Sequence, residues 1–497
     1  MRPNRYALDW KTAMRTGFLL LAACLTLACL RGSAAQEPAG SAMVGAMEQA
    51  MIDAIAQAEG SVVAIARVRK SRPGDTFPLE FRPDPFGRRL APAPAPQPTD
   101  PDFIPNEYGT GVVVGARGLI LTAHHVLGED SEYYVTTHER KVYRAWVKGA
   151  DPRSDLAVLA IDADDLTPIR FGNADRLQRG QLVIALGNPY AIARDGQASA
   201  SWGIVSNLAR KAPPSPNEFD PSDRSTLHHF GTLIQTDARL TLGTSGGPLL
   251  NRQGEMIGLC VALAATTSHE RAAGYAIPVD ATFHRVLATL KEGREVEYGF
   301  LGVRPTNLTP REMHAGVQGT RLSEVVPGTP ADRFGLREGD ILTAVDGTPI
   351  YDADGLYLEV GKLPVEAVAR LAILRNGRPR RVDVTLSKYP VRGWRVVTAP
   401  APAWRGLRVD YPTAWLDAAR HRTRTPAFDE GVVVIDVEDG SPAWEAGLRV
   451  GMLVTHVEKT AVRTPEQFQA AVSGRPGPLA LRTPDDPRQP VRTVPAE

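Results

Sequence analysis

One serine in this chain is set in a short glycine-rich turn, the segment Gly243–Pro248 with the sequence GTSGGP. A serine hydroxyl is a weak nucleophile at neutral pH, so it needs a base that takes its proton and donors that stabilise the oxyanion it creates. Flanking glycines allow the tight bend in which backbone N–H groups converge on one point. Ser245 is therefore a candidate nucleophile if the chain also supplies a histidine and an aspartate. Without them the turn is an ordinary Gly-Ser loop.

Both partners occur upstream in favourable settings. The stretch 118–126, GLILTAHHV, indicates an apolar strand that runs into a small-residue turn with two histidines. The stretch 151–159, DPRSDLAVL, places Asp155 at the start of a β-type apolar run. The chain order His, Asp, Ser is that of chymotrypsin-like enzymes and differs from the subtilisin and α/β-hydrolase orders.

The motifs LTAHHV, SDLAVL, GTSGGPL and GYAIP resemble those of the HtrA/Deg family of trypsin-like serine proteases. The resemblance covers residues 60–485 and implies a catalytic triad of His125, Asp155 and Ser245. The family pattern places the base fifth in Leu-Thr-x-x-His, immediately before a valine, which selects His125 and leaves His124 as a packing or surface neighbour. The alternative is that His124 is the base.

The resemblance also implies an oxyanion hole made by the backbone N–H groups of Gly243, Thr244 and Ser245. Two residues depart from the family pattern in this turn. Thr244 stands where the family usually has Asn, and Leu242 stands where it usually has Pro. Threonine is stiff at its first side-chain torsion, and the missing proline removes a local backbone restraint.

Charge and motifs exclude several function classes. Lys and Arg (57) nearly balance Asp and Glu (56), so no strong field points to nucleic acid. No phosphate-cradling Walker motif is visible, which favours an ATP-independent activity. We expect no metal and no cofactor, because four histidines lack metal-ligand spacing and are interpreted as loop residues: His138, His228, His229 and His269.

The amino end, residues 1–35, has the pattern of a signal peptide. Basic residues precede an apolar run, and small residues ending at Ala35 offer a cleavage site. The run is too short to favour a spanning helix, so we expect export to the periplasm. The segments ending at Cys24 and, more loosely, Cys29 also resemble a bacterial lipobox, so a lipid-anchored protein facing the periplasm is the alternative. Only in that case would a membrane be a partner.

The remaining chain is expected to be mainly β. Short apolar runs between Gly, Pro, Asn and Asp clusters suit a chymotrypsin-like double β-barrel, interrupted by an exposed loop at 210–229. The expected division is a helical segment at 36–60, a protease domain at 61–292 with a proline-rich loop at 69–106, and two repeat units at 294–390 and 400–490.

The two repeat units share a pattern of strand, glycine turn, short helix ended at Gly-Leu, tight turn and strand. The segment 324–342 is echoed by 436–454, and each copy resembles a small α+β PDZ domain in the permuted form of bacterial proteases. The resemblance implies a carboxylate-binding loop in the first copy, whose N–H groups can hold a peptide's terminal carboxylate. That loop is Phe300-Leu301-Gly302-Val303, and its nearest equivalent in the second copy is Trp404-Arg405-Gly406-Leu407. The second copy also differs in having Met452 at the position of Asp340.

The strand Gly258-Leu259-Cys260-Val261 is expected to line the specificity pocket, and it carries no acidic residue. It therefore predicts preference for a medium apolar side chain, which is exposed mainly in unfolded proteins. The hypothesis is an exported serine endopeptidase that degrades misfolded proteins and binds C-terminal peptides. The resemblance implies a homotrimer or higher oligomer. The alternative is a proteolytically silent chaperone or scaffold, favoured only by Thr244 and Leu242.

Overall fold

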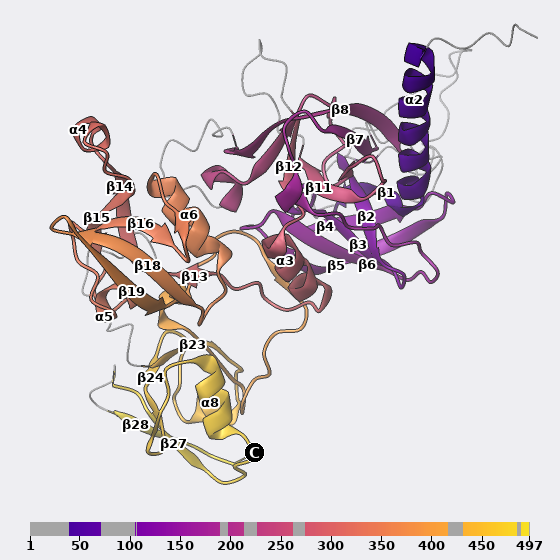
Figure 1. Cartoon of the computed structure of the whole chain (residues 1–497). Coiled ribbons are helices and arrows are strands. Elements are labelled where there is room, and N and C mark those ends of the chain that lie inside the picture. Colours follow the sequence, from indigo (N-terminus) through magenta and orange to yellow (C-terminus); the bar gives the residue numbers. More distant parts are fainter. Residues whose placement is uncertain are drawn as a thin grey trace, which may run out of the picture. The chain divides into compact units, whose positions relative to one another are not determined.

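A computed structural model describes residues 39–70, 105, 107–188, 197–212, 226–261, 274–415, 431–484 and 489–496 (Figure 1). The chain divides into two units, of which the first ends at Asp53 and the second begins at Ala54. Helix α2 (Ala39–Ala58) begins in the first unit and ends in the second. The expected signal peptide and nearly all of the proline-rich loop lie outside the described residues. Within those residues, no helix is long and apolar enough to cross a membrane.

The first barrel has six antiparallel strands in the order β5-β4-β1-β2-β3-β6, and pairing of β5 with β6 closes it. All six residues of β6 are buried, because the barrel core covers one face and α3 (Ala281–Lys291) packs on the other. Its strands are β1 (Val62–Arg69), β2 (Glu107–Gly115), β3 (Leu119–Ala123), β4 (Ser131–Thr136), β5 (Val142–Asp151) and β6 (Leu156–Ile161).

The second barrel is closed in the order β10-β11-β12-β9-β8-β7. Apolar side chains from several of its strands, among them Val183, Ile234 and Leu249, fill its core. Its strands are β7 (Leu182–Gly187), β8 (Ser199–Arg210), β9 (Leu233–Thr236), β10 (Pro248–Leu250), β11 (Met256–Val261) and β12 (Gly274–Pro278). The mainly β, double-barrel fold expected from the sequence is confirmed.

Helix α3 follows the second barrel. It begins where the Asp280 carboxylate accepts a hydrogen bond of 2.8 Å from the N–H of Phe283, which satisfies one of the first-turn donors. Short 3₁₀ turns connect other elements: η1 (Glu59–Ser61), η2 (His124–Val126), η3 (Ala174–Arg176), η6 (Leu227–Phe230) and η7 (Pro412–Trp415).

The first repeat unit has a sheet in the order β14-β15-β16-β18-β19, and α6 packs against its strands. Buried Leu322, Leu342 and Leu371 lie in its core. Its elements are β13 (Gly299–Phe300), β14 (Val303–Asn307), α4 (Pro310–His314), β15 (Thr320–Val325), α5 (Pro330–Arg333), β16 (Ile341–Val345), β17 (Thr348–Pro349), α6 (Ala353–Lys362), β18 (Val368–Arg375), β19 (Arg378–Thr385) and β20 (Ser387–Lys388).

The second repeat unit has two small sheets, β22-β23-β24 and β26-β25-β27-β28, packed with α8 around Phe468. In both units the short helix ends before a glycine with φ of 78°, Gly335 and Gly447, as the repeat predicts. Its elements are β22 (Leu407–Asp410), β23 (Val432–Val437), α7 (Pro442–Glu445), β24 (Leu453–Val454), β25 (His456–Val457), β26 (Thr460–Ala461), α8 (Pro465–Val472), β27 (Leu479–Arg482) and β28 (Val491–Val494).

One strand between the repeat units belongs to neither of them. Strand β21 (Val396–Val397) pairs antiparallel with β5, where Val396 lies opposite Ala150 and Val397 opposite Gly149. The chain between the repeat units therefore extends the sheet of the first barrel.

Candidate active site

Ser245 lies in the turn that enters β10 of the second barrel, and it is 7% exposed. The turn needs glycine at two positions, because Gly243 and Gly246 have φ of 92° and 86°. Two backbone hydrogen bonds of 2.9 Å fix it, one from the N–H of Gly246 to the Cys260 carbonyl and one from the N–H of Thr110 to the Ser245 carbonyl. The hydroxyl is thus presented from a rigid turn.

His125 and Asp155 come from the first barrel. His125 lies in η2 directly after β3, and Asp155 immediately precedes β6, which pairs with β3. His125 Nε2 lies 3.0 Å from Ser245 Oγ, and His125 Nδ1 lies 2.8 Å from Asp155 Oδ2. The structure therefore brings the three predicted triad side chains into one hydrogen-bonded chain across the two barrels.

Asp155 is fixed from two further directions. Its Oδ1 accepts a 2.9 Å hydrogen bond from the N–H of His125, and its carbonyl accepts another of 2.9 Å from the N–H of His124. Its backbone is left-handed, with φ of 54°, a region that aspartate tolerates better than most side chains. These bonds hold the Asp155 carboxylate in position to accept a hydrogen bond from the His125 ring.

The two ionisable partners shift each other's pKa in opposite directions. Burial alone would lower the pKa of His125, but the charge of Asp155 and its hydrogen bond outweigh burial and raise the pKa above 6.5. Burial alone would raise the pKa of Asp155, but the charge and hydrogen bond of His125 outweigh it and lower the pKa below 3.8. The pair thus favours a carboxylate that stabilises an imidazolium.

One of the three predicted oxyanion donors makes a hydrogen bond within the turn. The N–H of Thr244 donates to the Thr241 carbonyl at 3.0 Å, so it is engaged within the turn. The Thr244 hydroxyl accepts from the N–H of Thr241 at 3.1 Å, so this side chain stabilises the turn through its own hydrogen bond. Of the three predicted donors, Gly243 and Ser245 remain candidates for binding an oxyanion.

The predicted pocket strand lies in β11 beside the serine turn, since the N–H of Cys260 donates to the Gly247 carbonyl at 2.7 Å. Gly258, Leu259, Cys260 and Val261 are all buried. The Cys260 side chain packs in the core of the second barrel, and burial raises its thiol pKa to about 12. Cys260 therefore contributes to packing, and the surface that a substrate side chain would meet stays a prediction.

Comparisons with known proteins agree with this arrangement. Residues 109–259 match the trypsin-like peptidase domain, and residues 321–375 and 433–482 each match the PDZ domain. A probable periplasmic serine endoprotease DegP-like from Chlamydia trachomatis is 30% identical over 84% of this chain and 80% of its own length. This chain belongs to the HtrA/Deg family.

Further relatives of this HtrA/Deg protease support the same assignment. The periplasmic serine endoprotease DegP of Escherichia coli is 29% identical over 75% of this chain and 73% of its own length. A solved structure of the HtrA-type protease AlgW with a decapeptide is 26% identical, with a TM-score of 0.50, and covers 68% of this chain and 98% of AlgW. The protein is a serine endopeptidase with a trypsin-like domain and two PDZ domains.

The two predicted peptide loops of this HtrA/Deg protease occupy equivalent places. The carbonyls of Leu301 and Gly302 accept from the N–H groups of Ala331 and Val326, each at 2.9 Å. In the second PDZ domain the carbonyls of Arg405 and Gly406 accept from the N–H groups of Ala443 and Glu438, at 3.2 and 2.9 Å. The sequence alignment of the repeats is thereby supported in three dimensions.

The second loop is closed on itself. The N–H groups of Trp404 and Leu407 donate to each other's carbonyls at 2.8 Å, and both central residues have positive φ, 49° at Arg405 and 78° at Gly406. The Arg405 guanidinium is buried and donates to backbone carbonyls, among them Gly477 O at 2.6 Å. The N–H of Leu407 is thus used within the turn, and peptide binding by this loop stays a prediction.

Three residues near the triad were missed or misplaced by the sequence analysis. His228, expected in an exposed loop, is buried in η6, and its Nε2 lies 2.8 Å from the Ser154 carbonyl, next to Asp155. Burial lowers its pKa, which favours the neutral imidazole. Arg153 and Trp394 also contact this region, and no local pattern in the sequence distinguishes them.

Proposed function

We propose that this HtrA/Deg protease cleaves unfolded proteins through a triad in which Ser245 is the nucleophile, His125 the base and Asp155 the orienting carboxylate. The observation that supports the proposal is the hydrogen-bonded chain from Ser245 Oγ to His125 Nε2 (3.0 Å) and from His125 Nδ1 to Asp155 Oδ2 (2.8 Å). This is the geometry that a serine needs for activation.

In the proposed mechanism, Ser245 Oγ attacks the carbonyl carbon of the substrate while His125 Nε2 takes the hydroxyl proton. The negative charge that forms on the substrate oxygen is stabilised by the N–H groups of Gly243 and Ser245. The imidazolium then donates its proton to the leaving amine, and water hydrolyses the acyl-enzyme by the same steps. Asp155 fixes the tautomer with the proton on Nδ1 and stabilises the charged ring.

The finer features of this function are part of the same proposal. The relatives are named periplasmic, which supports export of this chain to the periplasm, whether soluble or lipid-anchored. The AlgW structure carries a decapeptide, which supports peptide binding here by the loop at 300–303. We retain the domain ranges 61–292, 294–390 and 400–490 and the preference for apolar side chains as predictions. A homotrimer or higher oligomer is also retained, to be measured by light scattering after gel filtration.

The test compares cleavage of unfolded casein by the protein lacking residues 1–35 with cleavage by Ser245→Ala. Ser473→Ala, a hydroxyl on the surface of the second PDZ domain, is the matched control. Each protein is measured with and without a peptide that has a hydrophobic C-terminus. We expect the wild type and the control to cleave casein and to be labelled by a fluorophosphonate, and Ser245→Ala to do neither. We expect the peptide to stimulate casein cleavage.

Two results would contradict the proposal. Casein cleavage by Ser245→Ala at the wild-type rate would exclude Ser245 as the nucleophile. A wild type that neither cleaves casein nor reacts with a fluorophosphonate, with or without peptide, would favour the alternative of a peptide-binding chaperone on a silent protease fold.

A further inference from the structure

The segment 389–399, between the two PDZ domains, packs along the first barrel, and we name it the strap. Its strand β21 pairs with β5, and the Thr398 hydroxyl donates to the Lys148 carbonyl at 2.6 Å. The N–H groups of Thr398 and Ala399 both donate to the Gly293 carbonyl, at 3.0 and 2.9 Å. A linker that only tethered two domains would not need this set of backbone bonds.

The strap meets the turn that carries the triad carboxylate. Strand β5 ends at Asp151, and residues 151–155 connect it to β6 and contain Asp155. Below this turn, the Arg153 guanidinium stacks on the ring of Tyr389, with 3.6 Å from its central carbon to the ring centre. Arg153 is 3% exposed, and its Nε and Nη1 have no hydrogen-bond acceptor among the described residues, so the Tyr389 ring is its principal contact to the strap.

A second contact reaches the residue that binds Asp155. His124 Nε2 lies 2.8 Å from the Trp394 carbonyl, and the two rings lie 5.6 Å apart. A carbonyl can only accept, so His124 carries its proton on Nε2 and donates. The N–H of the same His124 donates to the Asp155 carbonyl at 2.9 Å. His124 therefore joins the strap to the backbone of Asp155, since its side chain bonds the Trp394 carbonyl and its N–H bonds the Asp155 carbonyl.

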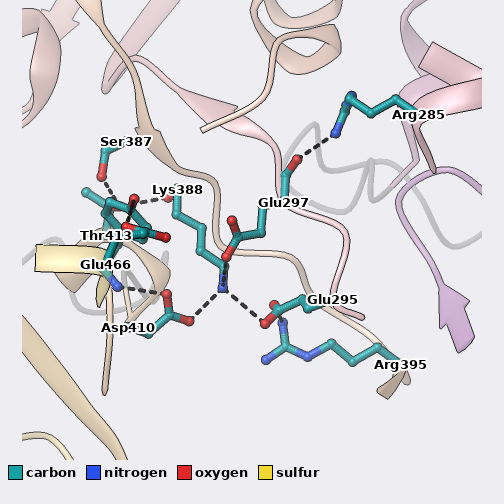
Figure 2. A network of polar contacts seen from close by, with 10 residues as sticks. Arg285, Glu295, Glu297, Ser387, Lys388, Arg395, Asp410, Thr413 and Glu466 are labelled. Atoms are coloured by element: carbon teal, nitrogen blue, oxygen red, sulfur yellow. Dashed lines mark hydrogen bonds and ion pairs between the residues drawn. The ribbon is translucent and has the colours of Figure 1, made fainter. Parts of the chain in front are cut away.

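Ion pairs hold Lys388, directly before the strap, and Arg395, within it, as Figure 2 shows. Lys388, which precedes it, is 3% exposed and contacts Asp410 of the second PDZ domain at 2.7 Å. Lys388 also lies 3.1 Å from both Glu295 and Glu297, in the segment between α3 and β13. Arg395 within the strap contacts Glu295 at 2.6 Å. The second PDZ domain is therefore joined by an ion pair to the residue that precedes the strap.

We propose that the strap positions the triad, by holding Asp155 through His124 and Arg153 in the left-handed conformation that directs its carboxylate to His125. This inference rests on the proposed protease function. His124, Arg153 and Trp394 are positioning residues, since none of them contacts the reacting atoms. A left-handed non-glycine residue persists only where its surroundings fix it, and the strap supplies part of those surroundings.

The test uses His124→Phe, which keeps a ring but removes the donor, and His124→Gln, whose amide can still donate. The measurement is the pH profile of kcat/KM, with kcat and KM separated and normalised to active sites by fluorophosphonate titration. In His124→Phe a less firmly held Asp155 supports the imidazolium less well. Because about one hydrogen bond is lost, we expect roughly a tenfold lower kcat at unchanged KM. We also expect the midpoint of the pH profile to move to lower pH. In His124→Gln we expect the wild-type kcat and the wild-type pH midpoint.

A second variant covers the case in which His124→Phe does not fold. Trp394→Ala removes the ring beside His124 and loosens the accepting carbonyl, so we expect the pH midpoint to move in the same direction. Trp415→Ala, a half-exposed tryptophan of the second PDZ domain, is the matched control and is expected to keep the wild-type profile.

The outcomes separate this inference from the proposed function. If the wild type is active and His124→Phe and Trp394→Ala have the same pH midpoint and kcat as the wild type, the positioning role of the strap is overturned. The protease function is then left intact. Equal losses in His124→Phe and His124→Gln would overturn the hydrogen-bonded route. A wild type that neither cleaves nor labels would overturn the protease function, and the strap's role in catalysis with it.

Discussion

Asp155 combines a nearly buried carboxylate with a backbone that few side chains adopt. Its side chain is 12% exposed, its φ is 54°, and its two carboxylate oxygens accept from the ring and the backbone N–H of His125. Asparagine tolerates the same left-handed backbone. The substitution Asp155→Asn therefore removes the charge while it leaves the chain path available.

The first prediction concerns the pH dependence of catalysis. His125 must be neutral to act as a base, so kcat/KM rises with pH, with a midpoint above 6.5 because Asp155 raises the pKa of His125. In Asp155→Asn we expect this midpoint to fall and kcat to drop roughly 10³- to 10⁴-fold, because the amide favours the wrong tautomer. The measurement is the pH profile of casein or peptide cleavage.

Asp165→Asn is the matched control, since Asp165 is exposed and has a left-handed backbone as well, with φ of 62°.

The pair of His125 and Asp155 also affects the stability of the fold, and the sign of its pH dependence is defined. Its contribution through His125 is full below pH 6.5 and is lost as pH rises through the raised pKa of His125. Asp155→Asn should therefore lower Tm more at pH 5 than at pH 9, and equal losses at both values would contradict the coupling.

The second prediction concerns the thiol of Cys260. It is fully buried in the core of the second barrel, and burial raises its pKa to about 12, so almost no thiolate forms at neutral pH. We expect no modification of Cys260 by iodoacetamide in the native protein and rapid modification in denaturant, read by mass spectrometry of the peptide that contains it. Modification of the native protein at the rate of a free thiol would show that the pocket strand is open.

At the scale of elements, the two PDZ domains use one backbone plan with different side chains. Leu301 packs in the core of the first domain, whereas Arg405 at the equivalent place donates to the carbonyls of Val494 and of the turn at 475–477. The arginine thus fixes the end of the second domain. A loop committed to such internal bonds has less to offer a peptide carboxylate.

The third prediction compares the two loops by matched substitutions. An added Cβ at Gly302 would lie 2.1 Å from Thr329 Oγ1, and one at Gly406 would lie 2.3 Å from Ser441 Cβ, so both alanines disturb their loops similarly. We expect Gly302→Ala to weaken binding of a peptide with a hydrophobic C-terminus at least tenfold, measured by fluorescence anisotropy. Gly406→Ala should leave it unchanged, and loss of binding in Gly406→Ala would assign the site to the second domain.

The sequence could predict the elements whose signals are local. The serine turn, the strands before His125 and after Asp155, and the Gly-Leu ends of the repeat helices are encoded within a few residues. The strap could not be predicted, because β21 has two residues and its pairing partner, β5, lies about 250 positions away. The domain ranges 294–390 and 400–490 leave most of the strap unassigned for the same reason.

Side-chain geometry at the site also exceeded what the sequence could give. Whether Thr244 stabilises the turn depends on the distance between its hydroxyl and the N–H of Thr241, which the type of residue does not specify. The burial of His228 likewise follows from η6 packing beside the Asp155 turn, and a polar stretch rich in proline gave no sign of it.

At the scale of the whole chain, one buried lysine is shared by three carboxylates from two segments (Figure 2). Burial raises the pKa of Asp410 and that of Glu297, in each case against the opposing charge of Lys388. For Lys388 itself, burial would lower the pKa, but the three carboxylates outweigh it and raise the pKa. Arg395 also pairs with Glu295, so the cluster has three carboxylates for two cations and keeps a surplus of negative charge.

The last prediction follows from this imbalance. Lys388→Met keeps the length of the side chain but leaves three carboxylates without their shared cation, so we expect a loss of about 3–5 kcal/mol in the free energy of unfolding. Glu297→Gln removes one surplus charge and should be neutral or slightly stabilising at pH 8. The raised pKa of Glu297 means that its ionisation costs stability as pH rises, so the benefit of Gln should shrink on acidification. Calorimetry of both variants at pH 5 and pH 8 measures this. A Glu297→Gln variant as destabilised as Lys388→Met would show that the carboxylates are each fully neutralised and that the cluster holds no surplus negative charge.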